Sequence, residues 1–383
     1  MSRAHAHSRQ RRSRTPLRIA LALVVVAVLA GGVLVAAGHH GHRGSASPPS
    51  TASATTVPAA PLRVQAITPA EGAAGVASDA TVTVAFSRPL AAASPLPTLA
   101  PAVPGTWQRL TPSTLAFVAS GPWVPATSVT VTVPDGPHGV TDRAGGTLPA
   151  PVTARFTVAP GSTLRLQQLL AQLGYLPVAF PPAAPLAGPQ EAAQPQEGSF
   201  TWRWSEPAGL VSLWSPGAEN VITRGAVMAF ERHHQLTTDG QAGPAVWSAL
   251  LADAAGGAAS TDPYNYVLVS KAVPQKVTVY SNGAPVYSTP ANTGVAAAPT
   301  VSGTFPVYLR YESQTMTGTN PDGSKYSDPG IPWVSYFNGG DALHGFVRGS
   351  YGWPQSVGCV EMPPANAQVV YPLTPIGTLV TVS

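Results

Sequence analysis

The sequence predicts a multidomain, mainly β protein in which a small helical domain separates two β domains. Proline (42 residues) and glycine (37 residues) make up about a fifth of the 383 residues, which favours short strands joined by turns. Apolar and polar residues alternate in several runs within residues 62–158 and 264–383, as in strands with one buried face. Residues 162–254 instead place apolar side chains at helical spacing.

The first 61 residues are not expected to belong to a folded domain. Residues 1–18 contain six arginines and no acidic residue, and residues 19–38 contain no charge. Twenty helical residues span about 30 Å, the thickness of the hydrocarbon core of a bilayer. We therefore expect a cytoplasmic basic tail, a transmembrane anchor at 19–38 and an extracytoplasmic remainder. A cleaved signal peptide, which would make the protein secreted, is the alternative. Residues 39–61 are a Ser/Pro/Ala linker.

The net charge of +4 comes from the N-terminal tail. The chain has 21 basic and 17 acidic residues, and removing the six arginines of the tail leaves 15 basic residues, a net charge near −2 for the remainder. Nucleic-acid binding requires a basic face on a folded domain. No nucleic-acid partner is therefore expected.

Residues 62–158 are expected to form a β-sandwich. Short alternating segments such as residues 81–86 and 129–133 predict strands, and turn residues such as Asp135-Gly136 separate them. The stretches at 67–69, 85–87 and 142–146 resemble bacterial Ig-like domains. The domain shows no candidate chemistry, and we interpret it as a spacer or docking module.

Residues 162–254 are expected to form three helices interrupted by an insertion. Four leucines at helical spacing predict a first helix capped by Ser162 or Thr163: Leu166, Leu169, Leu170 and Leu173. A second helix begins near Thr223, and a third follows the Asp-Gly turn at 239–240. Within the insertion, residues 200–204 alternate like a strand, which we expect to pair with residues 210–214. The three helices resemble the small peptidoglycan-binding domain, which implies contact with the cell wall.

Residues 264–383 are expected to be mainly β. Strands are predicted at 267–269, 276–280, 286–288, 303–311 and 378–382. The Asn282-Gly283 dipeptide between two of these runs is a strong signal for a two-residue hairpin turn.

Candidate chemistry is concentrated near the C-terminus. Cys359 is the only cysteine in the sequence and cannot form an internal disulfide. His344 lies fifteen positions upstream, and a nearby imidazole is the usual means of obtaining a thiolate near neutral pH. Gly358 leaves room for a substrate carbonyl and lets backbone N–H groups point at a developing oxyanion. Spacing alone leaves open an inert cysteine beside a core histidine.

The same residues resemble the signature of L,D-transpeptidases with a YkuD-type catalytic domain. Residues 343–346 (Leu-His-Gly-Phe) and 356–362 (Ser-Val-Gly-Cys-Val-Glu-Met) resemble its two motifs, and residues 299–305 and 331–337 resemble upstream segments. The resemblance covers residues 264–383 and implies a β-sandwich with little helix. It departs from the family pattern at two positions: Val357 replaces the usual His or Arg, and Glu361 replaces the usual Arg or Asn.

The resemblance also implies roles for individual residues. Cys359 would be the nucleophile and His344 the general base and acid, oriented by the backbone carbonyl of Gly345. The backbone N–H of Gly358 would contribute to the oxyanion hole. Four residues are expected to lie along the substrate groove: Ser356, which also shapes the turn, Tyr326, Trp333 and Val357.

The function implied is the formation of 3→3 cross-links in peptidoglycan through a cysteinyl thioester, with stem peptides as substrates and glycan as a binding partner. Two alternatives remain open: an L,D-carboxypeptidase that resolves the same thioester with water, and a catalytically silent wall-binding protein. No cofactor is expected, because the chain lacks a phosphate-binding loop and a Cys/His ligand set for a metal.

Overall fold

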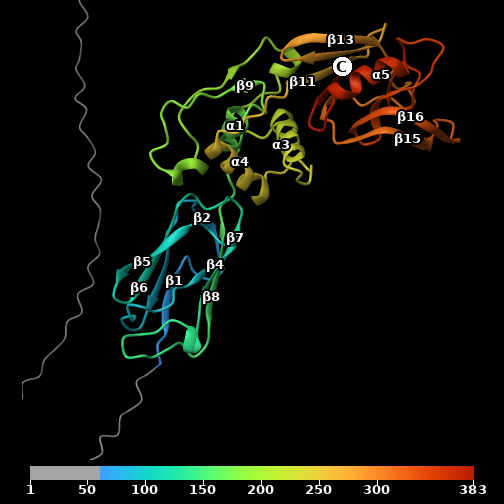
Figure 1. Ribbon diagram of the computed structural model, residues 1–383. Coiled ribbons are helices and arrows are strands. Elements are labelled where there is room, and N and C mark those ends of the chain that lie inside the picture. Colours follow the sequence, from blue (N-terminus) through green and yellow to red (C-terminus); the bar gives the residue numbers. More distant parts are fainter. Residues whose placement is uncertain (1–60) are drawn as a thin grey trace, which may run out of the picture. The chain divides into compact units, whose positions relative to one another are not determined.

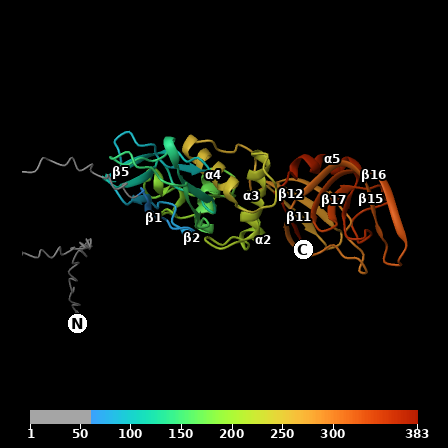
Figure 2. The same ribbon diagram turned by 90° about the horizontal axis from the view of Figure 1, so that it is seen from below.

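The computed structural model describes residues 61–383 (Figure 1). The expected tail, the expected anchor at 19–38 and nearly all of the linker lie outside the described residues. No helix within the described part is long and apolar enough to cross a membrane. Pro58–Ser383 forms one compact unit, and its fold confirms the expected order of a β domain, a helical region and a second β domain (Figure 2).

The first β domain is a sandwich of two four-stranded sheets. Its strands are β1 (Val64–Thr68), β2 (Ala73–Val76), β3 (Val82–Phe86), β4 (Thr98–Ala100), β5 (Gly105–Thr111), β6 (Thr114–Ala119), β7 (Ser128–Val133) and β8 (Val152–Val158). One sheet has the order β1-β3-β6-β5 and the other β2-β8-β7-β4. The alternation predicted at β3 and β7 appears as alternating burial, and the inward residues form one core around Trp123 and Phe156.

The helical region contains the three expected helices, one short additional α-helix and a 3-10 helix at Pro189–Ala193. Its elements are α1 (Thr163–Gln172), β9 (Val178–Ala179), β10 (Thr201–Trp202), α2 (Ala208–Val211), α3 (Val221–His233) and α4 (Pro244–Gly256). Ser162 caps α1 by accepting a hydrogen bond from the backbone N–H of Arg165.

The expected partner of the short strand at 201–202 was wrong. Strand β10 pairs with β9, and residues 208–211 form helix α2. Alternation indicates a strand, but it does not specify which segment the strand pairs with.

The second β domain consists of two sheets around a common core. Its elements are β11 (Asn265–Ser270), β12 (Lys276–Ser281), β13 (Ala284–Pro290), β14 (Gly303–Pro306), β15 (Leu309–Thr319), β16 (Lys325–Asn338), β17 (Asp341–Gly345), β18 (Val360–Met362), α5 (Pro364–Val370) and β19 (Leu379–Val382). The sheets have the orders β13-β12-β11-β19-β14 and β15-β16-β17-β18. The predicted hairpin turn is present, with φ of 48° at Asn282 and 77° at Gly283.

The two faces of the β15-β16-β17-β18 sheet have different neighbours. Leu343 and Val360 belong to the main core between the sheets. On the opposite face, Ala342 packs with residues of the long β15–β16 hairpin. Because side chains alternate along a strand, His344 emerges on the same face as Ala342. This second face carries the candidate site.

Candidate active site

Strands β17 and β18 bring His344 and Cys359 together. The two strands are parallel, with His344 opposite Glu361 and Leu343 opposite Val360. Cys359 directly precedes β18, two residues before Glu361, and it packs beside Ala342. Ala342 and His344 share a face of β17 because residues two apart in a strand do so, and the packing of Cys359 beside Ala342 places the cysteine on that same face of the sheet. No hydrogen bond joins the two side chains within residues 61–383.

His344 is held as a neutral imidazole. Its side chain is buried, and Nδ1 lies 3.1 Å from the carbonyl oxygen of Gly345. A carbonyl only accepts hydrogen bonds, so Nδ1 carries the proton and Nε2 keeps its lone pair. Burial lowers the pKa of His344 below its ordinary value of 6.5. The imidazole is therefore ready to accept a proton at neutral pH.

Cys359 is held as a protonated thiol. Its Sγ donates a long hydrogen bond of 3.5 Å to the carbonyl oxygen of Gly340. Burial raises the pKa of Cys359 to about 12, the backbone N–H of Ala342 partly opposes this, and the carboxylates of Asp341 and Glu361 add to it. The resting pair is a thiol and a neutral imidazole.

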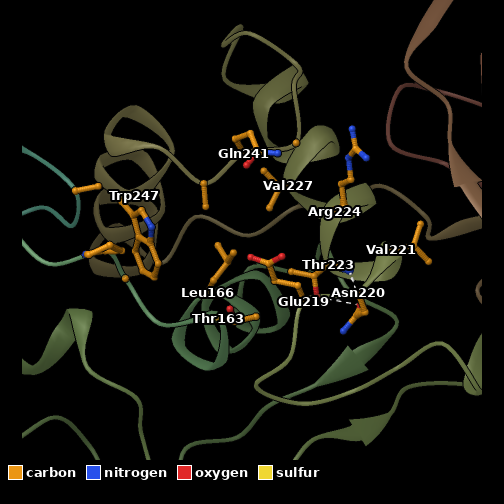
Figure 3. Close-up of a pocket in the computed structure, with 15 residues that line it drawn as sticks. Thr163, Leu166, Glu219, Asn220, Val221, Thr223, Arg224, Val227, Gln241 and Trp247 are labelled. Atoms are coloured by element: carbon orange, nitrogen blue, oxygen red, sulfur yellow. Dashed lines mark hydrogen bonds between the residues drawn. The ribbon is translucent and has the colours of Figure 1, made fainter. Parts of the chain in front are cut away.

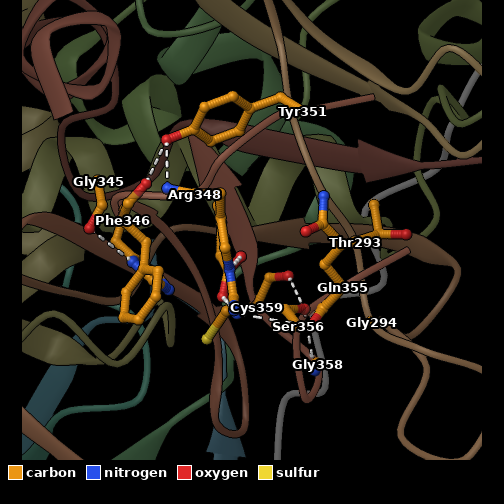
Figure 4. A network of polar contacts seen from close by, with 12 residues as sticks. Thr293, Gly294, Gly345, Phe346, Arg348, Tyr351, Gln355, Ser356, Gly358 and Cys359 are labelled. Carbon is orange, nitrogen blue, oxygen red and sulfur yellow. Dashed lines mark hydrogen bonds and ion pairs between the residues drawn. The ribbon is translucent and has the colours of Figure 1, made fainter. Parts of the chain in front are cut away.

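The turn before Cys359 is closed by Ser356 (Figure 4). The Ser356 side chain is buried; its Oγ donates to the backbone carbonyl of Cys359 (2.5 Å) and accepts from the backbone N–H of Gly358 (3.3 Å). Gly358 has φ of 121°, a region that favours glycine. The hydroxyl of Ser356 therefore acts within the turn.

Gly345 is confined by its surroundings. A Cβ atom at this position would lie 2.9 Å from Cα of Pro364 and 3.0 Å from Cγ of Pro332. These contacts come from the start of α5 and from β16. The missing side chain lets α5 pack directly against the strand that carries His344.

The three remaining predicted groove residues lie in different places. Tyr326 packs into the same apolar cluster as Cys359, built mainly from the β15–β16 hairpin. Trp333 packs against the main core, and its ring centroid lies 5.5 Å from that of Tyr371. Val357 is 37% exposed. The structure thus brings Tyr326, but not Trp333, beside the cysteine.

Two further neighbours of Cys359 carry no recognisable signal in the sequence. Tyr336 lies in the Cys359 cluster. Asp341 is half-buried, its Oδ2 accepts a hydrogen bond from the backbone N–H of Val301 (3.1 Å), and its charge raises the pKa of the thiol. Asp341 stands three residues before His344, but no local pattern marks it as a neighbour of the cysteine.

The helical region contains a separate cavity of about 490 Å³. Trp247 and Leu166 provide apolar walls, and Arg224, Asn220 and Glu219 provide polar groups (Figure 3). Mixed polar and apolar linings of this size are typical of small-ligand sites.

Comparisons with known proteins identify both β domains. Residues 264–382 match the model of the YkuD L,D-transpeptidase catalytic domain, and residues 58–158 match that of a bacterial Ig-like domain. No curated protein matches the chain.

Several solved structures are similar to parts or most of the chain. The catalytic domain of the E. faecium L,D-transpeptidase is 26% identical over 31% of this chain and 96% of that one, with a TM-score of 0.29. An L,D-transpeptidase from Mycobacterium smegmatis is 15% identical over 85% of this chain and 100% of that one, also with a TM-score of 0.29. L,D-transpeptidase 3 from Mycobacterium tuberculosis is 14% identical over 84% of this chain and 98% of that one, with a TM-score of 0.29. On the family matches, the chain carries a YkuD-type L,D-transpeptidase catalytic domain behind a bacterial Ig-like domain.

Proposed function

We propose that this protein is an L,D-transpeptidase that forms 3→3 cross-links between peptidoglycan stem peptides through a thioester on Cys359. The observation that carries the proposal is the placement of His344 on β17 and of Cys359, directly before the parallel strand β18, on one face of the sheet. That placement lies within a matched L,D-transpeptidase domain. The family implies stem peptides as the substrate.

In the first step, Sγ of Cys359 attacks the carbonyl carbon of the third residue of a tetrapeptide stem. Because the thiol is protonated at rest, its proton passes to Nε2 of His344 as the carbon–sulfur bond forms. The bond to the terminal D-Ala then breaks, and His344 returns the proton to the leaving amine. The product is a thioester on Cys359 and free D-Ala.

The oxyanion of this step requires donors near the thiol. We assign this role to the backbone N–H groups of Gly358 and Cys359. The N–H of Gly358 would exchange its 3.3 Å hydrogen bond to Ser356 for the developing charge. Tyr326 and Val357 would flank the donor peptide, the first through the apolar cluster and the second from its exposed position.

In the second step, the side-chain amine of a diamino acid on a neighbouring stem attacks the thioester. His344 accepts a proton from this amine, and the thiolate of Cys359 leaves and is reprotonated. The new amide joins the third residues of two stems. If water attacks instead, the same intermediate gives a tripeptide and the enzyme is an L,D-carboxypeptidase.

The remaining parts of the chain suit work in the cell wall. We propose that residues 19–38 hold the protein at the cytoplasmic membrane and that the Ig-like domain acts as a spacer on the outer side. The cavity beside Trp247 and Arg224 is our candidate for contact between the helical region and peptidoglycan.

Product analysis by mass spectrometry tests the proposal. The protein is incubated with disaccharide-tetrapeptides beside Cys359→Ala. Cross-linked dimers and free D-Ala, absent with the variant, are expected. Tripeptide monomers alone would identify a carboxypeptidase. An unchanged substrate, together with no mass increase on Cys359 after exposure to a carbapenem, would indicate a silent wall-binding protein.

A further inference from the structure

A buried carboxylate lies beside the proposed base. Glu361 is opposite His344 in the ladder between β17 and β18, and it is only 4% exposed. Cys359, two residues earlier, shares its face of the sheet. An uncompensated charge in such a place is costly, so a buried carboxylate requires a partner.

Arg348 provides that partner. Its Nε lies 2.8 Å from Oε2 of Glu361, and its Nη2 lies 2.8 Å from Oε1, which is a bidentate ion pair. The guanidinium also lies over the ring of Phe346, 4.6 Å from the ring centroid. The departure from the family pattern at position 361 is thus matched by an arginine thirteen residues upstream.

The same arginine closes the loop that joins the two proposed catalytic residues (Figure 4). This loop, residues 346–358, begins directly after Gly345 and ends directly before Cys359. Within it, the backbone N–H of Arg348 donates to the hydroxyl of Tyr351 (3.1 Å), and that hydroxyl donates to the carbonyl of Phe346 (2.5 Å). Nη2 of Arg348 reaches the carbonyl of Gln355 near the end of the loop (3.5 Å).

We propose that the ion pair of Arg348 and Glu361 is a positioning pair, which fixes the loop between His344 and Cys359 and balances the charge beside the imidazole. The inference rests on the proposed function, because it assigns a role to residues around that same site. Neither residue needs to touch the substrate for this role.

The charged groups around His344 indicate that the ion pair of Arg348 and Glu361 affects the pKa of the imidazole as well as the packing of the loop. Glu361 on β18 and Asp328 on β16 raise the pKa of His344, whereas Arg348 in the loop lowers it. The thiol of Cys359 is uncharged at rest. Removing one partner of the pair leaves the charge of the other uncompensated. Loss of Arg348 must therefore raise the pKa of His344, and loss of Glu361 must lower it.

A direct titration of His344 by NMR tests this in the Pro58–Ser383 unit, which is compact and has its own cores. The His344 signal is identified as the one lost in His344→Gln. Arg348→Met is expected to raise the midpoint by about one pH unit, and Glu361→Gln to lower it by a similar amount. The double variant is expected to return close to the wild-type value.

Matched controls remove the same charges elsewhere in the domain. Lys276→Met on β12 and Glu312→Gln on β15 change exposed residues and are expected to leave the midpoint in place. Arg348→Lys keeps the charge but not the fork of two contacts. It is expected to leave the midpoint in place and to slow carbapenem acylation of Cys359 severalfold.

Single variants that shift the midpoint in the same direction, or not at all, while circular dichroism shows a folded protein, would overturn the inference. If Arg348→Met does not fold, the titration midpoints of His344 in Glu361→Gln and Arg348→Lys test the inference instead. The titration needs no substrate. A wild-type protein that forms no product therefore refutes the proposed function without deciding this inference. Midpoints that fail to shift as expected refute this inference without deciding the proposed function.

Discussion

Oδ1 of Asp341 lies 2.7 Å from the position that a Cβ atom on Gly358 would occupy. A carboxylate from the start of β17 is thus packed against the backbone of the turn before Cys359. The close approach fixes the turn from the side of the neighbouring strand, and it places a negative charge near the thiol.

Gly358→Ala is expected to destabilise the domain and to suppress reaction at Cys359. The added methyl group would meet Asp341, and the residue would have to adopt a φ of 121°. Strained backbone of this kind costs about 1–3 kcal/mol. Thermal unfolding and the rate of carbapenem acylation measure both effects. Gly323→Ala is the matched control, because Gly323 also has positive φ but has open space around it. Equal losses in the two variants would contradict a role for the Asp341 contact.

Asp341→Asn is expected to make the thiol more reactive. The carboxylate raises the pKa of Cys359, so its removal lowers that pKa and increases the thiolate fraction at a given pH. A decrease of one unit in the pKa of Cys359 would increase the rate of its alkylation by iodoacetamide about tenfold at pH 8. Asp322→Asn, at an exposed position in the β15–β16 hairpin, is the control. An unchanged rate for Asp341→Asn would show that the charge does not act on the sulfur.

The acid limb of the pH profile is expected to lie below pH 6.5. Only neutral His344 accepts a proton, and burial lowers its pKa below 6.5, so the activity rises with pH through this lowered value. The thiol, with a pKa of about 12, adds no second limb near neutral pH. Measuring acylation of Cys359 from pH 4 to pH 9 tests this. A rate that still increases strongly above pH 8 would instead indicate attack by a preformed thiolate.

Gly345→Ala is expected to push α5 away from β17 and to shift the backbone carbonyl of residue 345, which orients His344. The new methyl group would lie 2.9 Å from Cα of Pro364. Overpacking of this kind costs about 1–3 kcal/mol. A lower melting temperature and a slower acylation are expected, whereas Gly349→Ala, with open space at its Cβ position, should change neither. A fully active Gly345→Ala variant would show that this packing does not position the imidazole.

Val357→His is expected to increase activity with the stem peptide. The family pattern has His or Arg at this position, and the exposed valine offers no hydrogen-bond donor to a substrate. A gained hydrogen bond contributes about 0.5–1.5 kcal/mol, which corresponds to a severalfold change in kcat/KM. A neutral or harmful effect would show that this departure does not weaken binding.

Much of the local structure was predictable because its signals are local. The Asn282-Gly283 turn, the cap at Ser162 and the strands β3 and β7 follow from residues that are neighbours in sequence. Cys359 and His344 likewise stand in short, contiguous motifs, and their assignment as catalytic residues stays a prediction.

Relationships between distant segments were not predictable in this way. The pairing of β10 with β9 depends on which edges meet, and the packing of Trp333 away from Cys359 depends on the two faces of one sheet. The contact between Asp341 and the turn at Gly358 likewise requires the register of β17 and β18.

The sequence by itself determined the class of fold, the order of the domains and the two residues on which the proposed chemistry depends. The tertiary structure decided their electrostatic state, because burial and the surrounding charges, unlike motifs, exist only after folding. Burial raises the pKa of Cys359 and lowers the pKa of His344. The tertiary structure also joins Arg348 to Glu361, because the loop between β17 and β18 folds back onto the strand that follows it.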